Sequence, residues 1–169
     1  MNNIYLIGFM GCGKSAVGRT LARKTYRRFM DTDAIIVESE GMPISQIFEE
    51  KGEAYFRQVE TTTMKSLIAE KKRIVSCGGG VALRQENVDA MRAGGTIVLL
   101  TATPETILKR VENDDKRPLL QGRKTVEGIT ELMNSRVPFY SEAADYTVST
   151  DDRSTEEIAK EIMNLMSLD

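Results

Sequence analysis

The sequence predicts an α/β domain, in which helices cover both faces of a parallel sheet. Short apolar runs recur along the chain, segments with helical spacing separate them, and several runs lead into glycine-rich sequence. We find no internal repeat, low-complexity tract or linker, so residues 1–169 are expected to form a single domain.

Five short segments are expected to be strands, and most of them are apolar and contain β-branched residues. The clearest spans residues 96–101, where nearly every residue is β-branched or leucine. Two others, 3–7 and 73–77, run directly into glycines. In chain order the predicted strands are Asn3–Ile7, Arg28–Asp31, Arg73–Cys77, Thr96–Thr101 and Tyr146–Thr150.

The segments between the predicted strands show apolar residues at helical spacing and residues typical of helix ends. Val17 and Leu21 lie four apart, Pro104 suits a first helical turn, and Ser154 with Glu157 forms a capping box. The predicted helices are Ser15 onward, Ile44–Lys51, Ala54–Glu70, Gln85–Arg92, Pro104–Val111, Thr125–Asn134 and Ser154 onward. Residues 112–124 are charged, contain Pro118 and Gly122 and lack periodicity, so we expect an exposed, mobile loop there.

The composition excludes several classes of function. A net charge of −2 disfavours a nucleic-acid or membrane partner. The N-terminal apolar run is short and has no basic leader, so no signal peptide is expected. Two cysteines suit a reducing cytosol, and no segment resembles an apolar partner helix, so we expect a cytoplasmic monomer. There is no histidine, so proton transfer must use a carboxylate, lysine, tyrosine or water.

Residues 8–15, GFMGCGKS, match the phosphate-binding pattern G-x-x-x-x-G-K-[ST] between a predicted strand and a predicted helix. Glycines let the backbone approach phosphate oxygens, so that successive N–H groups and the helix N-terminus face them. In this pattern Lys14 reaches the β- and γ-phosphates of a nucleoside triphosphate, and the Ser15 hydroxyl binds Mg²⁺. The candidate nucleotide-binding residues here are Gly11, Cys12, Gly13, Lys14, Ser15 and Ala16.

Asp31 and Asp33 follow the second predicted strand. One carboxylate could support hydrated Mg²⁺, which makes Asp31 a candidate metal residue beside Ser15, and the other could face an acceptor hydroxyl. The alternative is a pair of loop acids with no ligand.

Five further motifs follow the phosphate loop in order. They are Asp31-Thr32-Asp33, Gly52-Glu53-x-x-Phe56-Arg57-x-x-Glu60, Gly78-Gly79-Gly80, Arg117-Pro118-Leu119-Leu120 and Arg136-x-Pro138-x-Tyr140. In this order and spacing the chain resembles the shikimate kinase family, from the phosphate loop to the last strand. The resemblance implies a three-layer α/β/α fold like that of the nucleoside monophosphate kinases, with five parallel strands in the order 2-3-1-4-5. It also implies ATP, Mg²⁺ and shikimate as ligands.

The same resemblance implies roles for individual residues. A substrate-binding region would span about 33–60, and a lid would span about 112–124. Arg110 would lie near the adenine, and Arg153 belongs to a weaker match on that side, where family members often have a proline and this chain has Ser154-Thr155. Shikimate would be held by Asp33, Arg57, Gly78, Gly79, Gly80 and Arg136.

The chemistry of these residues agrees with those roles. Arginine binds a carboxylate through two parallel hydrogen bonds, which suits Arg57 and Arg136. Arg117, in the predicted mobile loop, could neutralise the transferring phosphoryl group and act in catalysis with Lys14 and Asp33. The alternatives are surface ion pairs for the arginines and a plain turn for the glycines.

Two other functions stay open at this level. A kinase for another hydroxy acid, such as gluconate, would use the same arginines for its carboxylate. A regulatory module that binds nucleotide without catalysis is the second alternative. Cys12 and Cys77 are expected to be small core residues, and a disulfide would require their Cα atoms to lie within about 7 Å.

Overall fold

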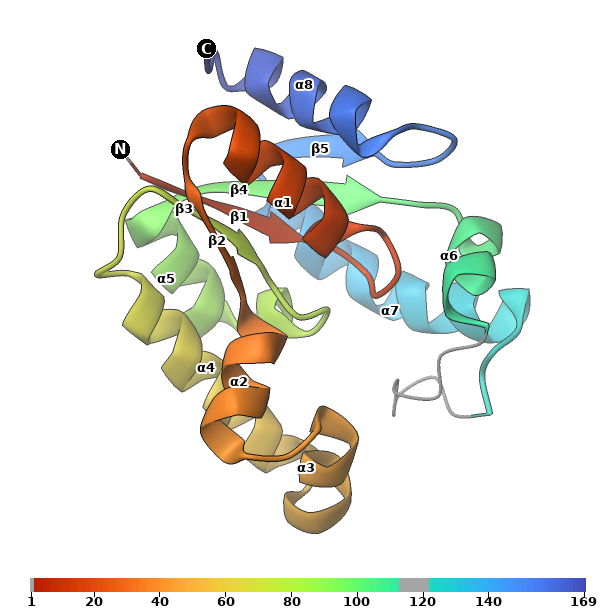
Figure 1. Cartoon of the computed structure of the whole chain (residues 1–169). Coiled ribbons are helices and arrows are strands. Elements are labelled where there is room, and N and C mark those ends of the chain that lie inside the picture. The colour runs from red at the N-terminus through yellow and green to blue at the C-terminus, as the bar shows by residue number, and fades with distance from the viewer. Residues whose placement is uncertain (1, 113–121) are drawn as a thin grey trace.

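The computed structural model describes residues 2–112 and 122–169 and shows a sheet of five parallel strands in the order β2-β3-β1-β4-β5 (Figure 1). The strands are β1 (Asn3–Ile7), β2 (Arg28–Asp31), β3 (Arg73–Ser76), β4 (Gly95–Thr101) and β5 (Tyr146–Ser149). Both the predicted strand positions and the strand order implied by the family resemblance are confirmed. Because the strands are parallel, all their carboxyl ends meet at one edge of the sheet.

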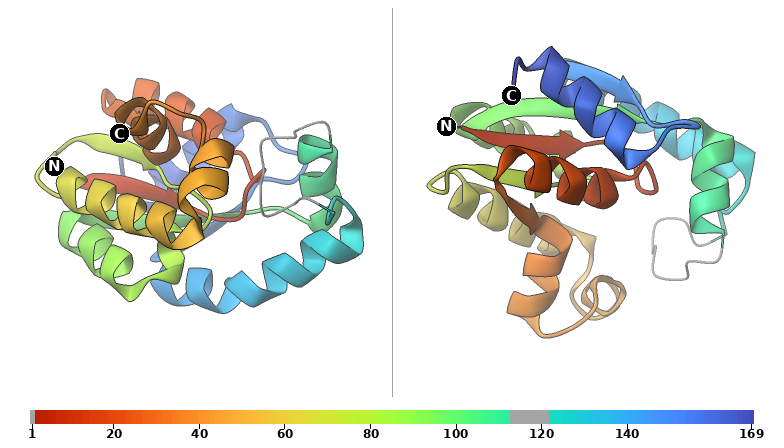
Figure 2. Two further views of the ribbon diagram at one scale, coloured as in Figure 1. Left: turned by 90° about the horizontal axis from the view of Figure 1, so that it is seen from below. Right: turned by 45° about the horizontal axis from the view of Figure 1, so that its top comes forward.

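Helices cover both faces of this sheet. On one face lie α1 (Lys14–Thr25) and α8 (Thr155–Leu165), which pack against each other. Figure 2 shows the opposite face, covered by α4 (Glu53–Leu67), α5 (Gln85–Gly94) and α7 (Val126–Ala143). Shorter elements complete the carboxyl edge: α2 (Thr32–Glu40), α3 (Ile44–Lys51), α6 (Pro104–Val111) and the 3-10 turn η1 (Val81–Leu83).

The central strands are buried on both faces. Every residue of β1 is buried, and Tyr5 pairs in register with Val75 of β3 and Ile97 of β4. A strand enclosed in this way needs a continuous apolar run, because helices remove both of its faces from water. In the part of the chain that the structure describes, no helix is long and apolar enough to cross a membrane.

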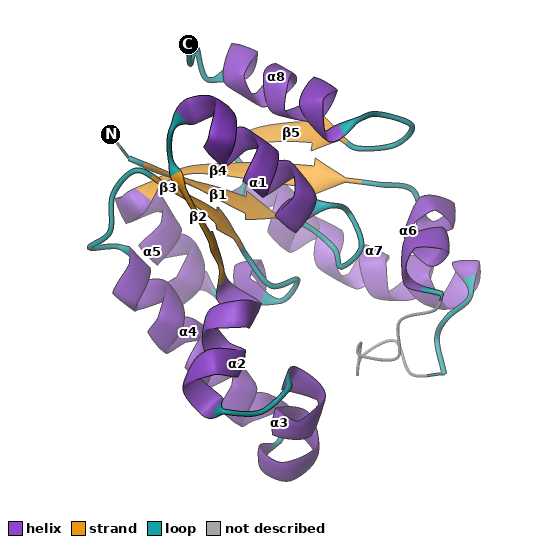
Figure 3. Ribbon diagram, viewed as in Figure 1, coloured by secondary structure: helices purple, strands orange, loops and turns teal. Residues whose placement is uncertain are grey.

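A second, smaller core lies between α2, α3 and α4, at the end of the molecule where these helices project from the sheet (Figure 3). Ile36, Ile47 and Phe56 are buried there, and the rings of Phe48 and Phe56 lie 5.0 Å apart. This small core coincides with the predicted substrate-binding region of residues 33–60.

Two helices differ from their predicted forms. α2 was not predicted, because its apolar residues 35–37 are consecutive and show no helical spacing. α7 continues to Ala143, well beyond the predicted end at residue 134, with Pro138 inside it. Proline removes one hydrogen bond within a helix, but Arg136 and Tyr140 on either side are buried, and this packing compensates. Most of the predicted mobile loop, residues 113–121, lies outside the described residues.

Helix α1 lies so close to the sheet that only glycine fits at one position. A Cβ at Gly18 would lie 2.6 Å from the Phe29 ring and 3.3 Å from a Leu6 methyl group. We therefore expect Gly18→Ala to lower the free energy of unfolding by about 1–3 kcal/mol through overpacking, although alanine favours helix by about 1 kcal/mol. Urea unfolding checks this expectation.

The double variant Gly18→Ala/Phe29→Leu provides the control. A smaller side chain at position 29 makes room for the new methyl group, so the cost of Gly18→Ala should shrink in that background. An unchanged or increased stability of Gly18→Ala alone would contradict the proposed contact.

Candidate functional site

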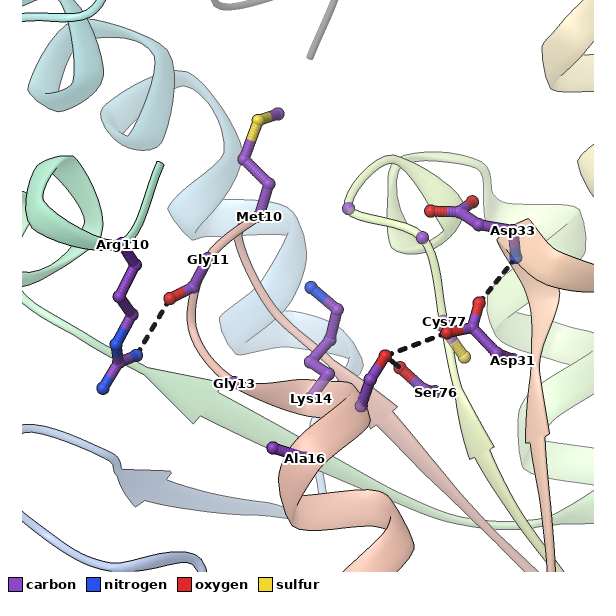
Figure 4. A pocket seen from close by; sticks show the side chains of 13 residues that line it. Met10, Gly11, Gly13, Lys14, Ala16, Asp31, Asp33, Ser76, Cys77 and Arg110 are labelled. Carbon is purple, nitrogen blue, oxygen red and sulfur yellow. Dashed lines mark hydrogen bonds between the residues drawn. The ribbon is translucent and has the colours of Figure 1, made fainter. Parts of the chain in front are cut away.

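A cavity of about 300 Å³ lies at the carboxyl edge of the sheet (Figure 4). It brings together the phosphate-binding loop, the end of β2 and the glycines after β3, three segments that are distant in sequence. The lining residues are Met10, Gly11, Gly13, Lys14, Ser15, Ala16, Asp31, Asp33, Ser76, Cys77, Gly78, Gly79 and Arg110. The carboxyl ends of parallel strands are the usual place for ligands in such folds.

The phosphate-binding loop takes its shape from its glycines, all three of which have positive φ. Gly11 has φ 77° and Gly13 has φ 90°, and residues with a side chain rarely adopt such a backbone conformation. Gly13 caps α1, so the N-terminus of this helix points into the cavity. The Lys14 ammonium donates to the carbonyls of Gly8 at 2.8 Å and Phe9 at 3.0 Å, which holds a buried positive charge inside the loop.

Ser15 and Asp31 meet across the cavity floor. The Ser15 hydroxyl donates to Asp31 Oδ2 at 2.9 Å and lies 3.2 Å from the Ser76 hydroxyl. Asp31 Oδ1 accepts from the N–H groups of Asp33 at 2.9 Å and Ala34 at 3.2 Å, so Asp31 is also the N-cap of α2. This cap is the local reason why a helix begins directly after β2.

The possible metal ligands at this point suit Mg²⁺. They are hydroxyl and carboxylate oxygens, and Mg²⁺ in phosphoryl-transfer sites is commonly bound by one or two carboxylates with phosphates and water. Among the described residues no group of three or more acidic, cysteine or histidine side chains forms a complete metal cage. Ser15 and Asp31 therefore fit an ion whose other ligands come from nucleotide and water.

The glycines after β3 have charged groups directly against their backbone. A Cβ at Gly78 would lie 2.8 Å from Asp33 Oδ1, and a Cβ at Gly79 would lie 3.1 Å from Arg136 Nη1. At Gly80 it would overlap the Arg57 guanidinium. The structure thus brings the predicted substrate residues Asp33, Arg57, Gly78–Gly80 and Arg136 together.

Glu60 joins this cluster and had no role predicted for it. Its Oε1 accepts from Arg57 Nη1 at 2.8 Å, and its Oε2 would lie 2.9 Å from a Cβ at Gly78. The side chain is 1% exposed; burial raises the pKa of Glu60, and neighbouring Arg57 partly opposes this shift. The i, i+3 spacing of Arg57 and Glu60 on a predicted helix was the available signal for this pair.

Two buried polar atoms of the cluster have no hydrogen-bond partner in the described part of the chain. They are Glu60 Oε2 and Arg136 Nη1. Arg136 is 4% exposed and lies over the Phe9 ring, with its guanidinium carbon 5.6 Å from the ring centroid. Buried charged groups rarely lack partners, so the cluster is suited to a polar ligand.

The remaining predicted residues differ in where they lie. Arg110 borders the cavity and donates to the Gly11 carbonyl at 2.9 Å, where it also contacts Thr150. Arg153 lies outside the cavity lining and pairs with Glu161 at 2.5 Å. Cys12 and Cys77 are both buried and free, and Arg117 lies outside the described residues.

Asp31 both carries a charge beside Ser15 and caps α2, and two substitutions separate the charge from the cap. Asn is as good an N-cap as Asp, so Asp31→Asn should keep the free energy of unfolding within about 0.5 kcal/mol, whereas Asp31→Ala should lose about 1 kcal/mol. Urea unfolding of both variants checks this. Equal losses in the two would show that the charge of Asp31, and not its cap of α2, stabilises the fold.

Comparisons with known proteins identify the family. The family model for shikimate kinase matches residues 10–167. A shikimate kinase of Persephonella marina is 43% identical over 163 residues, 96% of this chain and 98% of the relative, and one of Dehalococcoides mccartyi is 41% identical over 161 residues, 95% and 91%.

Solved structures agree with this match. The shikimate kinase of Acinetobacter baumannii in complex with shikimate superposes with a TM-score of 0.95 at 36% identity, over 99% of this chain and 93% of that one. A gluconokinase of Sinorhizobium meliloti reaches a TM-score of 0.59 at 19% identity, over 98% and 91%, which shows a shared fold only. With its phosphate-binding loop, its strand order and these relatives, the chain belongs to the shikimate kinase family.

Proposed function

We propose that this protein transfers the γ-phosphoryl group of ATP to the 3-hydroxyl of shikimate, giving shikimate 3-phosphate and ADP. The reaction belongs to the chorismate route of aromatic amino acid biosynthesis. The observation that carries the proposal is the family match over residues 10–167. The charged cluster around Gly78–Gly80 supports it, because it combines two arginines for a carboxylate with a carboxylate for hydroxyl groups.

The chain's own residues have separable tasks in this reaction. The N–H groups of the phosphate-binding loop and Lys14 bind the β- and γ-phosphates. Arg57 and Arg136 bind the shikimate carboxylate, and Asp33 orients the acceptor hydroxyl toward the γ-phosphate and accepts its proton. Since the transition state of phosphoryl transfer is usually loose, orientation contributes more than base strength.

Four further groups complete the proposed site. Mg²⁺, held by Ser15 and Asp31, would neutralise phosphate charge. Arg117, from the predicted lid, would stabilise the transferring group, and closure of that lid would exclude water. Arg110 would lie beside the adenine and Arg153 further out on the same side.

The setting of the enzyme is also a proposal. The two free cysteines suit a reducing cytoplasm, and the overall composition suits a soluble monomer with small-molecule partners only.

ADP release with Mg-ATP, measured with shikimate, with gluconate and with neither, tests the proposal. We expect a large rate that depends on shikimate. Stimulation by gluconate instead would favour a kinase for that hydroxy acid. ATP binding without any acceptor-dependent turnover would favour a regulatory nucleotide-binding module.

Asp33→Asn should lower kcat by about 100-fold or more, because the amide has one acceptor oxygen fewer to orient the hydroxyl and cannot take its proton, while the affinity for ATP stays near that of the wild type. Asp89→Asn, an exposed aspartate of α5, is the matched control and should behave as the wild type. Steady-state kinetics and nucleotide titration check both variants. Near-normal turnover of Asp33→Asn would remove Asp33 from the mechanism.

A further inference from the structure

Tyr140 reaches from α7 to the backbone of the glycine run. Its hydroxyl donates to the Gly79 carbonyl at 2.6 Å, and its side chain is 4% exposed. Burial raises the pKa of Tyr140 to about 12, so the hydroxyl remains a donor at neutral pH. A group tied in this way to a carbonyl, with so high a pKa, does not serve as the proton acceptor of the reaction.

A second hydroxyl, from α2, binds the same run. The Thr32 side chain, fully buried at the start of α2, accepts from the Gly78 N–H at 2.9 Å. Thr32 lies between Asp31 and Asp33, so its hydroxyl links the two proposed ligand-binding carboxylates to the glycine backbone.

The other carbonyls of the run are bound within the run's own turn. The Gly78 carbonyl accepts from Val81 N–H and the Gly80 carbonyl accepts from Leu83 N–H, each at 3.1 Å. Within residues 2–112 and 122–169, the N–H groups of Gly79 and Gly80 are the backbone donors of the run left without a protein acceptor. Gly79 also lines the cavity.

We infer that Tyr140 and Thr32 are positioning residues, which fix the peptide planes of the glycine run so that the Gly79 and Gly80 N–H groups are presented to the phosphoryl acceptor. The inference rests on the proposed function for the identity of that acceptor. Arg136 lies one turn before Tyr140 on α7 and approaches the same glycine. The Tyr140 hydroxyl therefore sets the distance between the Arg136 guanidinium and the Gly79 N–H, which act on the same substrate.

Tyr140→Phe tests this directly, because it removes the hydroxyl and keeps the ring. Without this hydroxyl a glycine N–H loses its orientation toward the substrate. KM for shikimate should then rise about three- to tenfold, with kcat and KM for ATP within about twofold of the wild type. Tyr5→Phe is the matched control: this tyrosine is also buried but lies in β1, where its hydroxyl bonds to Asn3, so all three constants should stay unchanged.

A readout without substrate makes the test independent of the proposed function. In ¹⁵N–¹H spectra, Tyr140→Phe should shift the Gly79 and Gly80 amide resonances, and Tyr5→Phe should not. If the wild type releases no ADP with shikimate, the proposed function fails, while the amide shifts still decide the inference. An active wild type with unchanged shikimate KM in Tyr140→Phe overturns the inference alone.

The other hydroxyl supplies a second pair of variants, which decides the question if Tyr140→Phe does not fold. Thr32→Val removes the acceptor at constant shape and should raise KM for shikimate by a similar factor, and Thr32→Ser restores an acceptor and should return KM to within about twofold of the wild type. Equal KM values in the two variants would show that the Thr32 hydroxyl does not position the glycine run.

Discussion

The absence of side chains at residues 78–80 is the constraint on which the site depends. Asp33 from α2, Arg57 and Glu60 from α4, and Arg136 from α7 all approach this backbone within the space that a single methyl group would occupy. Any larger residue would separate these charges, and with them the three helices that carry them. The cluster is thus a property of how three helices pack around one glycine run.

The sheet supplies the other half of the arrangement. Because every strand runs in the same direction, the phosphate-binding loop after β1, the acidic segment after β2 and the glycine run after β3 meet at one edge. The Ser15–Asp31 hydrogen bond crosses from the first of these to the second, and the Thr32–Gly78 hydrogen bond crosses from the second to the third. The proposed nucleotide-binding and acceptor-binding residues are therefore linked by hydrogen bonds between segments that follow three strands of the sheet.

Much of this arrangement could be predicted from the sequence, for physical reasons that also explain what could not. Buried strands are continuous apolar runs, and the phosphate-binding loop has fixed spacing, so both were recognisable. Helix α2 was missed because a side-chain cap starts it, where apolar periodicity is absent. Glu60 and Tyr140 lay in recognised motifs, but their roles follow from distances to glycines that are remote in sequence. Arg117 and the lid stay predictions.

The small core of Ile36, Ile47 and Phe56 has a consequence for dynamics. Local opening costs less free energy where few apolar side chains are buried, so α2 and α3 should exchange their amide hydrogens with solvent well before the sheet does. Since α2 carries Asp33, an acceptor bound at the proposed site would slow this exchange by linking the helix to the glycine run. Recognition of the acceptor and ordering of this end of the molecule are then one thermodynamic event.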